Sequence, residues 1–553
     1  MILLSLLLFF SQSTFVSVDL GSQYFRFALS SIKEPVMMGM NENNKMMTPS
    51  AIAFKLPNYT GKHMTIDEAM KCEIKYGDDA IKFLKRKNLS GSPYVPRIVG
   101  RTFSSNFDIP SILNSTEMLS ILISKVLNNI DNIEGISITI PNYYTLSQRE
   151  CIIEAVNLTG YPLFGLLDDT SAIIQLYTIK YSNKFIYESH GVLFIDIGAS
   201  AVRAYRVVFT QNETDPLGTQ TSYEWTEKTG GLEFIRKVSL FENCSMNKAQ
   251  KLLISGNKDY SELLEEDLEI IYEIVRIAID GEVDEVQLIG GASRFPFVID
   301  YVKKVVGYTD VLKDLPQMNS IALGSLHIML STLNQSRYKL IPVVKPPFYT
   351  SVVQCSNFEG QYCELRKKCK NYVILESTVC KTASIIAKSE VPEGASNVLA
   401  MFDFKNITNF PHDVENPSSG FVIMQEPAPF ISSAMWCQPG RRICLPIQTE
   451  PTVNDDPLRK RKEKFVDEIL RADHDRRKKG EFKARISSIV DKLNSFISAT
   501  NNLQFEKEDN EIIEMIQKAV QITDGEINLS VSEIRQFLIK LEKKAKELKI
   551  KID

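Results

Sequence analysis

The sequence of 553 residues has no long apolar run after its first residues, no Cys-x-x-Cys pair and no excess of one charge. No later stretch approaches the ~18 apolar residues that a membrane-spanning helix needs, so we expect no stable membrane insertion. A formal net charge of −4 provides no overall attraction to nucleic acid, which we exclude as a partner. The content of 44% hydrophobic and 24% charged residues is typical of globular chains, and the length predicts two or three domains.

An apolar run from Met1 to Phe10 opens the chain, and small or polar residues follow it. This pattern is typical of a secretory signal peptide, which we place at residues 1–14, and it predicts a secretory-pathway protein. A buried first strand is the alternative, because no Lys or Arg precedes the run. No KDEL-type signal ends the sequence, so we expect either the lumen of the endoplasmic reticulum (ER), with retention through a partner, or secretion.

The cysteines and the glycosylation sequons fit an oxidising compartment. Most of the nine cysteines lie in one segment: Cys355, Cys363, Cys369, Cys380, Cys437 and Cys444. Their even number there predicts disulfides, and metal binding is the alternative, which the lack of a neighbouring histidine disfavours. Asn-x-Ser/Thr sequons that predict a glycoprotein include Asn58, Asn88, Asn157, Asn212 and Asn406.

Three zones with different patterns follow the predicted signal peptide. Residues 15–336 alternate short β-branched runs with longer amphipathic stretches, as in GVLFIDIG and EVQLIGG, which is typical of an α/β domain. Residues 337–456 contain Pro clusters and alternating runs such as NYVILESTV, which predict a small antiparallel β domain. In residues 457–553, apolar residues recur at three- and four-residue spacing, and this spacing predicts a helical bundle.

Two hydrophobic strands run into the same short motif, Asp-x-Gly followed by a small residue, at Asp19 and at Asp196. Such carboxylates organise Mg²⁺ and its waters, and small residues let backbone N–H groups approach phosphate oxygens. A third segment, LIGGASRFP, ends a strand with Gly290 and Gly291 and supplies Arg294, whose guanidinium can stack on a flat base. Alone, each motif is an ordinary strand and turn.

In this order and at these separations, the three motifs resemble the first phosphate, second phosphate and adenosine motifs of the actin-like ATPase superfamily. The resemblance is specifically to its heat-shock protein 70 (Hsp70) chaperone family. Further segments carry it: TPS at 48–50, YGDDA at 76–80, RIVGR at 97–101, ITIP at 138–141, LDDTSA at 167–172 and GGLE at 230–233. Within the family, the motifs look more like the large ER branch, that of the 170-kDa glucose-regulated, or hypoxia up-regulated, protein.

The resemblance implies an actin-like nucleotide-binding domain over 15–336, a β-sandwich for unfolded chains over 337–456 and a helical lid over 457–553. It implies ATP or ADP with Mg²⁺ as the cofactor, with Asp19 and Asp196 binding the metal through water. The residues at the family's nucleotide-binding positions are Asp19, Gly21, Ser22, Gln23, Asp169, Asp196, Gly198, Ala199, Ser200, Lys251, Gly290, Gly291, Ala292 and Arg294. It also implies nucleotide exchange on the conventional ER chaperone BiP and the holding of unfolded secretory polypeptides.

The sequence departs from the ATP-hydrolysing members of the family at three positions. Pro96 stands where they carry a catalytic Lys, and the loss of such a donor typically costs ~3 kcal/mol of transition-state stabilisation. Ala201 and Arg203 stand where they carry Thr and Asp. We therefore assign no catalytic residue and expect at most a weak ATPase. Arg203 either pairs with a phosphate or is a strand residue that points to solvent.

The adenine-binding side is reduced as well. Of the positions that relatives use there, only Lys251 keeps its charge, and the stretch from Gly231 to Glu266 is shorter than its counterpart. This predicts a shortened upper lobe.

We therefore expect an ER-lumenal chaperone or cochaperone that hydrolyses ATP weakly or not at all. One alternative is an ATP-hydrolysing chaperone that uses Asp19 and Asp196 around Mg²⁺, and a measurable basal ATPase would distinguish it. The other is a nucleotide-free interaction scaffold, whose thermal stability would not change in saturating ATP.

Overall fold

The structure is a computed structural model. It describes residues 13–31, 36–55, 71, 73–84, 90–102, 113–212, 215–307, 311–312, 314–341, 343–344, 351–356, 362–365, 368–369, 372–376, 382–403, 421–425, 433–437, 444–447, 457–499, 508–548 and 550. Residues 1–12 of the predicted signal peptide, Cys380 and the sequons at Asn58, Asn88 and Asn406 lie outside the described residues.

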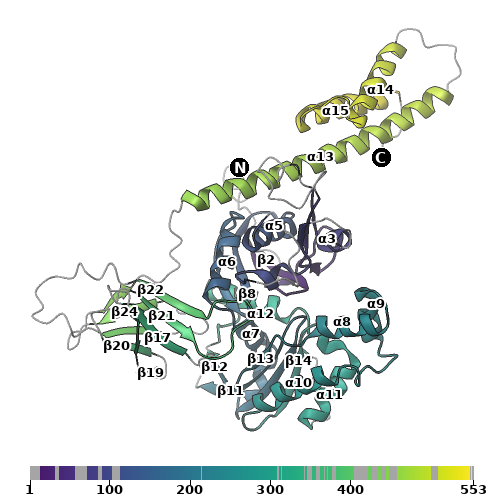
Figure 1. The fold of residues 1–553 in the computed structure, drawn as a ribbon. Helices are drawn as coiled ribbons and strands as arrows, with labels where there is room; N and C mark the ends of the chain where they lie inside the picture. Colours follow the sequence, from purple (N-terminus) through teal and green to yellow (C-terminus); the bar gives the residue numbers. More distant parts are fainter. Residues whose placement is uncertain are drawn as a thin grey trace, which may run out of the picture. The chain divides into compact units, whose positions relative to one another are not determined.

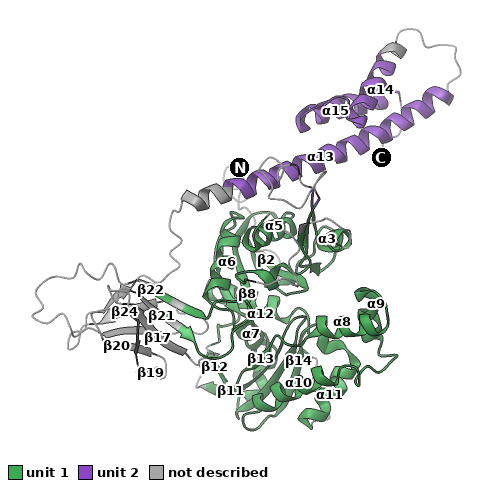
Figure 2. Cartoon of the chain, in the orientation of Figure 1, with its two compact units in different colours: residues 1–54, 75–460 green, residues 55–74, 461–553 purple. Residues whose placement is uncertain are grey.

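The chain divides into two compact units (Figure 2). The first comprises residues 1–54 and 75–460, and the second comprises residues 55–74 and 461–553. The first unit contains two lobes, each built on its own sheet, together with the strands between residues 351 and 447. The second unit contains the C-terminal helices.

The first lobe is built on a sheet with the order β3-β2-β1-β8-β9, in which β4 also pairs with β2. Figure 1 labels β2 and β8 of this sheet. Its strands are β1 (Thr14–Leu20), β2 (Tyr24–Ser31), β3 (Met37–Met38), β4 (Thr48–Pro49), β8 (Ile133–Ile140) and β9 (Leu163–Asp168). β1 pairs antiparallel with β2 and parallel with β8. Every residue of β1 is buried, as expected of a central strand that is covered on both faces.

The second lobe repeats this plan on a sheet with the order β15-β14-β10-β11-β12-β16, in which β13 also pairs with β11. Its strands are β10 (His190–Ile197), β11 (Val202–Asn212), β12 (Asp215–Gln220), β13 (Glu224–Thr226), β14 (Glu285–Ile289), β15 (Val311–Leu312) and β16 (Val343–Val344). β10 pairs antiparallel with β11 and parallel with β14, as β1 pairs with β2 and β8.

Two helices, α7 (Asp169–Tyr181) and α12 (Ser320–Thr332), connect the lobes and pack against each other. α7 follows the first-lobe sheet but packs on the second, where Tyr177 meets the Phe194 ring edge to face. α12 follows the second-lobe sheet but packs on the first. The helices approach so closely that a Cβ on Gly324 would lie 1.8 Å from the carbonyl oxygen of Ala172. This crossing joins the two lobes.

Shorter elements complete the first lobe. β5 (Ile52–Lys55) pairs antiparallel with β7 (Ser90–Ser92), and β6 (Glu73–Tyr76) leads into α3 (Gly77–Leu84). The remaining helices are α4 (Val95–Ile98), α5 (Ser115–Leu127) and α6 (Leu146–Asn157). The side chain of Asn114 caps α5 by accepting a hydrogen bond from the Glu117 N–H, in a full capping box.

Helices make up most of the second lobe outside its sheet. Its helices are α8 (Gly231–Phe241), α9 (Met246–Ser255), α10 (Glu265–Ala278), α11 (Pro296–Val306) and the 3₁₀ turn η2 (Ala292–Arg294). α8, α9 and α10 pack in one apolar core with residues of β10 and β11. The described residues between 231 and 284 contain no strand, and the shortened upper lobe stays a prediction.

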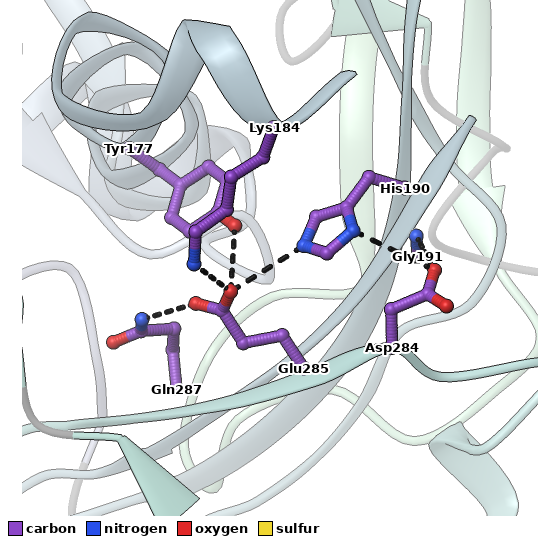
Figure 3. A network of polar contacts seen from close by, with 7 residues as sticks. All are labelled: Tyr177, Lys184, His190, Gly191, Asp284, Glu285 and Gln287. Atoms are coloured by element: carbon purple, nitrogen blue, oxygen red, sulfur yellow. Dashed lines mark hydrogen bonds and ion pairs between the residues drawn. The ribbon is translucent and has the colours of Figure 1, made fainter. Parts of the chain in front are cut away.

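A buried polar network ties α7 and the 3₁₀ turn η1 (Ser182–Phe185) to the starts of β10 and β14, at the ends of these strands farthest from Asp196 (Figure 3). The carboxylate of Glu285 accepts hydrogen bonds from the Tyr177 hydroxyl at 3.2 Å, from Gln287 at 2.5 Å and from Lys184. The Nε2 atom of His190 lies 3.3 Å away. Burial alone would raise the pKa of Glu285, but hydrogen bonds from His190, Lys184 and Gln287 lower it to about 2.

Two antiparallel sheets follow the lobes, with the orders β18-β17-β21-β22 and β19-β20-β23-β24-β25. Their strands are β17 (Ser351–Ser356), β18 (Tyr362–Leu365), β19 (Lys368–Cys369), β20 (Tyr372–Glu376), β21 (Thr382–Ala387), β22 (Val398–Asp403), β23 (Phe421–Gln425), β24 (Ser433–Cys437) and β25 (Cys444–Ile447). The backbone register sets Cys355 opposite Cys363, and Cys437 opposite Cys444. The disulfides stay a prediction, because these side chains lie outside the described residues.

Hydrogen bonds to backbone carbonyls connect this β region to the lobes. The Thr102 N–H donates to the Gly394 carbonyl at 2.7 Å, and the Arg149 guanidinium donates to the Leu399 carbonyl at 2.5 Å. Before these strands, β16 extends the second-lobe sheet by pairing parallel with β12.

The second unit is helical, with α13 (Pro457–Ala499), α14 (Glu508–Asp524) and α15 (Val531–Glu547). Residues from all three helices share one apolar core, including Ile489, Ile522 and Leu541. Ser530 caps α15 through a capping box with Glu533. None of the helices in the described part of the chain combines the length and the apolar character that crossing a bilayer requires.

The predicted mixture of α/β lobes and a helical C-terminal region is confirmed. The packing of the two antiparallel sheets as a β-sandwich stays a prediction, as do the predicted domain boundaries.

Candidate functional site

A cavity of about 120 Å³ lies where β1, β10 and β14 end, between the two lobes. The carboxyl ends of parallel strands are where α/β proteins place ligands. Of the nucleotide-binding positions that the resemblance implies, those that line this cavity are Asp19, Gly21, Ser22, Gln23, Asp169, Asp196, Gly198, Ala199, Ser200, Gly290, Gly291, Ala292 and Arg294. Lys251 is exposed and does not line it, whereas its neighbour Gln250 does.

The two phosphate-type hairpins place their aspartates in equivalent positions. Asp19 lies on β1 directly opposite Arg26 on β2, and Asp196 lies on β10 directly opposite Arg203 on β11. Residues directly opposite in antiparallel strands have neighbouring side chains. The Asp19 carboxylate is 3.3 Å from the Arg26 guanidinium, and Asp196 forms an ion pair with Arg203. Each hairpin therefore carries its own cation beside its own carboxylate.

The Arg203 guanidinium contacts two carboxylates. One of its nitrogens pairs with Asp196 on the same hairpin, and the other pairs with Asp169, the first residue of α7. The side chains of Arg203, Asp169 and Asp196 are 10%, 5% and 2% exposed. The alternative in which Arg203 points to solvent is therefore wrong, because the side chain is buried and two carboxylates of the chain itself bind it. Its pairing with a phosphate stays a prediction.

Burial makes these carboxylates costly to ionise without a cation. It raises the pKa of Asp196 to about 7, and the nearby Asp19 carboxylate adds to the increase. Burial also raises the pKa of Asp19, although Arg26 and Arg203 oppose the increase. The arginines therefore supply counter-charge at a place where the fold excludes water.

The two hairpin loops touch each other. The hydroxyl oxygens of Ser22 and Ser200 are 2.5 Å apart and form a hydrogen bond between residues 178 positions apart in the sequence. On the third side, Gly290 has a positive φ of 86°, and a Cβ on it would lie 2.4 Å from an Asp196 carboxylate oxygen. The two hairpin loops and the Gly290 turn therefore meet around the cavity.

Two contacts beside the cavity join the lobes. The Arg101 guanidinium makes two hydrogen bonds of 2.7 Å to the Glu227 carboxylate, and these side chains are 3% and 16% exposed. Tyr143, which follows β8, stacks on Trp225 of β13 with ring centroids 4.2 Å apart and planes 8° apart. Such contacts hold the lobes in one arrangement with protein side chains alone.

Sequence reasoning missed Arg26, Arg101, Tyr143 and Trp225. A signal for the first was present, because the segments DLGSQYFR and DIGASAVR share the pattern Asp-x-Gly with an Arg seven residues after the Asp. In a tight hairpin this spacing places the two residues opposite each other, as the register of both hairpins has it. Arg101 and Glu227 have no comparable signal, since 126 residues separate them.

Comparisons with known proteins agree with this architecture. The family model described as Hsp70 protein matches residues 110–270. Hypoxia up-regulated protein 1 from Xenopus laevis is 21% identical over 391 residues, which cover 56% of this chain and 59% of that protein. The human protein of the same name is 20% identical over 390 residues, covering 56% of this chain and 39% of that protein. Heat shock protein 110 from Caenorhabditis elegans is 22% identical over 259 residues, covering 36% of this chain and 33% of that protein.

Over these stretches the chain is similar to Hsp70 proteins, as a divergent large member of that superfamily would be. Its matched stretches span less than two thirds of the length of these relatives. The matching region includes the second hairpin and α7, which contribute Asp169, Asp196 and Arg203 to the cavity.

Hsp70 proteins bind ATP or ADP with Mg²⁺, and the residues of this cleft do not fit that cofactor. Arg203 and Arg26 occupy the carboxylates that would organise the metal. A volume of about 120 Å³ is also well below the ~300–1,000 Å³ of typical ligand pockets. The described residues include no group of three or more His, Cys, Asp or Glu side chains that could hold a metal ion. The assignment of individual residues as nucleotide ligands stays a prediction.

Pro96 lies in the first turn of α4, where its missing N–H leaves no helix bond unmade. It is buried, and its carbonyl accepts a hydrogen bond from the Tyr144 hydroxyl at 3.4 Å. Tyr144 itself lines the cavity. The position at which hydrolysing relatives carry a catalytic Lys therefore supports the wall of the cleft and offers no charge to it.

Proposed function

We propose that this protein is a chaperone of the secretory pathway that works without ATP turnover of its own. The observation that carries the proposal is the set of buried contacts in the cleft, in which Arg203 binds Asp169 and Asp196 and Arg26 binds Asp19. These guanidiniums take up the charges that a magnesium–nucleotide complex would need. Similarity to the Hsp70 family supports the chaperone role.

In this proposal the protein acts in the ER lumen as a nucleotide exchange factor for the conventional ER chaperone BiP and holds unfolded secretory polypeptides. The similarity to proteins named Hypoxia up-regulated protein 1 and the apolar start of the sequence support it. The contacts Arg101–Glu227 and Tyr143–Trp225 support it as well, because they fix the lobes without a nucleotide. An exchange factor acts on BiP through its surface, so it needs a fixed arrangement of its two lobes more than it needs a nucleotide cycle of its own.

A nucleotide-free interaction scaffold is the second candidate, and the same buried arginines favour it. The two candidates differ in one activity, the acceleration of nucleotide release from BiP. An autonomous ATP-hydrolysing chaperone has less support, because Pro96 contributes no donor and Arg203 neutralises Asp196.

The test is the release of a fluorescent ADP analogue from purified BiP, with and without this protein, together with its own steady-state ATP hydrolysis. We expect release to be about tenfold faster or more, within the ordinary range of coupling between two ligands, and no measurable hydrolysis. Suppression of client aggregation without faster release would support the scaffold instead. Hydrolysis that Asp196→Ala abolishes would overturn both.

A matched pair of variants tests whether the fixed lobes matter. Arg101→Ala removes the pair with Glu227 and should reduce the acceleration of ADP release. Arg276→Ala removes an exposed pair with Glu273 on α10 and should leave it unchanged. Equal acceleration by both variants would contradict the role given to the fixed lobes.

A further inference from the structure

Arg203 lies between two buried carboxylates at the cavity. It forms ion pairs with Asp169 and Asp196, and Asp19 lines the same cavity. Removing the guanidinium would leave two buried carboxylates without a partner, and burying unpaired charge is strongly unfavourable. The fold around them therefore requires a cation at this point.

The pairing register of the β10–β11 hairpin fixes the position of Arg203. β10 and β11 pair residue by residue from His190↔Phe209 to Ile197↔Val202, which sets Arg203 opposite Asp196. Asp168 accepts a hydrogen bond from the Ser171 N–H at 2.7 Å and so begins α7 immediately before Asp169. Both carboxylates are thus held by regular elements, and each contacts a different nitrogen of the guanidinium.

We propose that the Arg203 guanidinium is a built-in counter-ion that takes the place of a divalent cation in the cleft, and that its removal would create a divalent-cation site. Mg²⁺ and Mn²⁺ fit this chemistry, because hard cations of this size bind one or two carboxylates and keep several water ligands. Asp169 and Asp196 supply the carboxylates, and the space that the guanidinium leaves would admit the waters. The proposal concerns metal binding alone and does not depend on the chaperone activity.

The experiment titrates Mn²⁺ into the full chain and follows both binding by isothermal calorimetry and the thermal unfolding midpoint. We expect Arg203→Ala and Arg203→Gln to bind one Mn²⁺ with a Kd of about 10⁻⁴ M, as weakly built carboxylate sites do. At ~100 times that Kd, the midpoint of these variants should rise by about 3 °C. The unsubstituted protein should bind Mn²⁺ at least about tenfold more weakly and show no rise.

Controls separate this role from a merely structural one. Arg203→Lys keeps a cation in place and should not gain a metal site. Arg206→Ala removes an arginine of the same strand that donates to the Glu282 carbonyl and to Thr221, and it should not respond to metal. Asp196→Asn added to Arg203→Ala should abolish the response.

The proposal fails if the unsubstituted protein binds Mn²⁺ as tightly as the variants do. It also fails if folded Arg203→Ala and Arg203→Gln both ignore the metal. If neither variant folds in metal-free buffer, refolding in Mn²⁺ becomes the measurement: recovery of the native circular dichroism supports the proposal, and its absence at every Mn²⁺ concentration overturns it.

Discussion

The ion pair between Arg101 and Glu227 joins the two lobes, and its removal gives a prediction whose size can be worked out. Both side chains are largely buried, and two hydrogen bonds of 2.7 Å connect them. Replacing one partner of a buried pair leaves the other charge without compensation, which typically costs ~3–5 kcal/mol. We therefore expect Arg101→Ala to lower the free energy of unfolding of the first unit by about 4 kcal/mol.

The double variant distinguishes the pair from the packing of each side chain. Arg101→Ala combined with Glu227→Ala removes both charges, so no buried charge is left unpaired. Its cost should be smaller than the sum of the single costs by ~1–3 kcal/mol, which is the coupling energy of residues in contact.

Urea unfolding followed by tryptophan fluorescence measures these values. Trp225 stacks on Tyr143 next to the pair, so its emission reports the junction of the lobes, and Trp436→Phe removes the other tryptophan. Arg276→Ala breaks an exposed pair and should cost at most ~1 kcal/mol. A cost for Arg101→Ala no larger than this control would refute the reasoning.

Two further variants test the network at Glu285 and the helix crossing. The folded pKa of Glu285 is about 2, below the ordinary 4.5, so its contribution of about 3 kcal/mol is complete above pH ~4.5 and is lost as the pH falls toward 2. In urea titrations, Glu285→Gln should therefore be less stable than the unsubstituted protein at pH 7 and should lose less stability between pH 5 and 2. The exposed control Glu282→Gln should match the unsubstituted protein. Parallel stability–pH profiles of Glu285→Gln and the unsubstituted protein would contradict the lowered pKa of Glu285. Gly324→Ala should lower the free energy of unfolding by ~3 kcal/mol or more, because the added Cβ forces α7 and α12 apart. The control Gly480→Ala has open space on α13 and should stabilise its helix by up to ~1 kcal/mol. Equal effects of the two variants in thermal unfolding would exclude the close crossing of α7 and α12.

The sequence alone determined the local elements and the composition of the cleft. The hydrophobic runs before Asp19, Asp196 and Gly290 form β1, β10 and β14, because a buried parallel strand needs a continuous apolar stretch. The order and separation of the three motifs also carried the resemblance to the actin-like ATPase superfamily. The helical end of the chain followed from its three- and four-residue spacing.

Only the tertiary structure decided what the charges in the cleft do. From the sequence, Arg203 was equally consistent with a solvent-exposed residue and a phosphate ligand, because nothing local places Asp169 beside it. The pairing of Arg101 with Glu227 and the contact of Ser22 with Ser200 join residues that only the docking of the lobes brings together. Local patterns specify strands and turns, whereas the partner of a buried charge depends on how distant elements pack. In this cleft, that packing places the Arg203 guanidinium between Asp169 and Asp196.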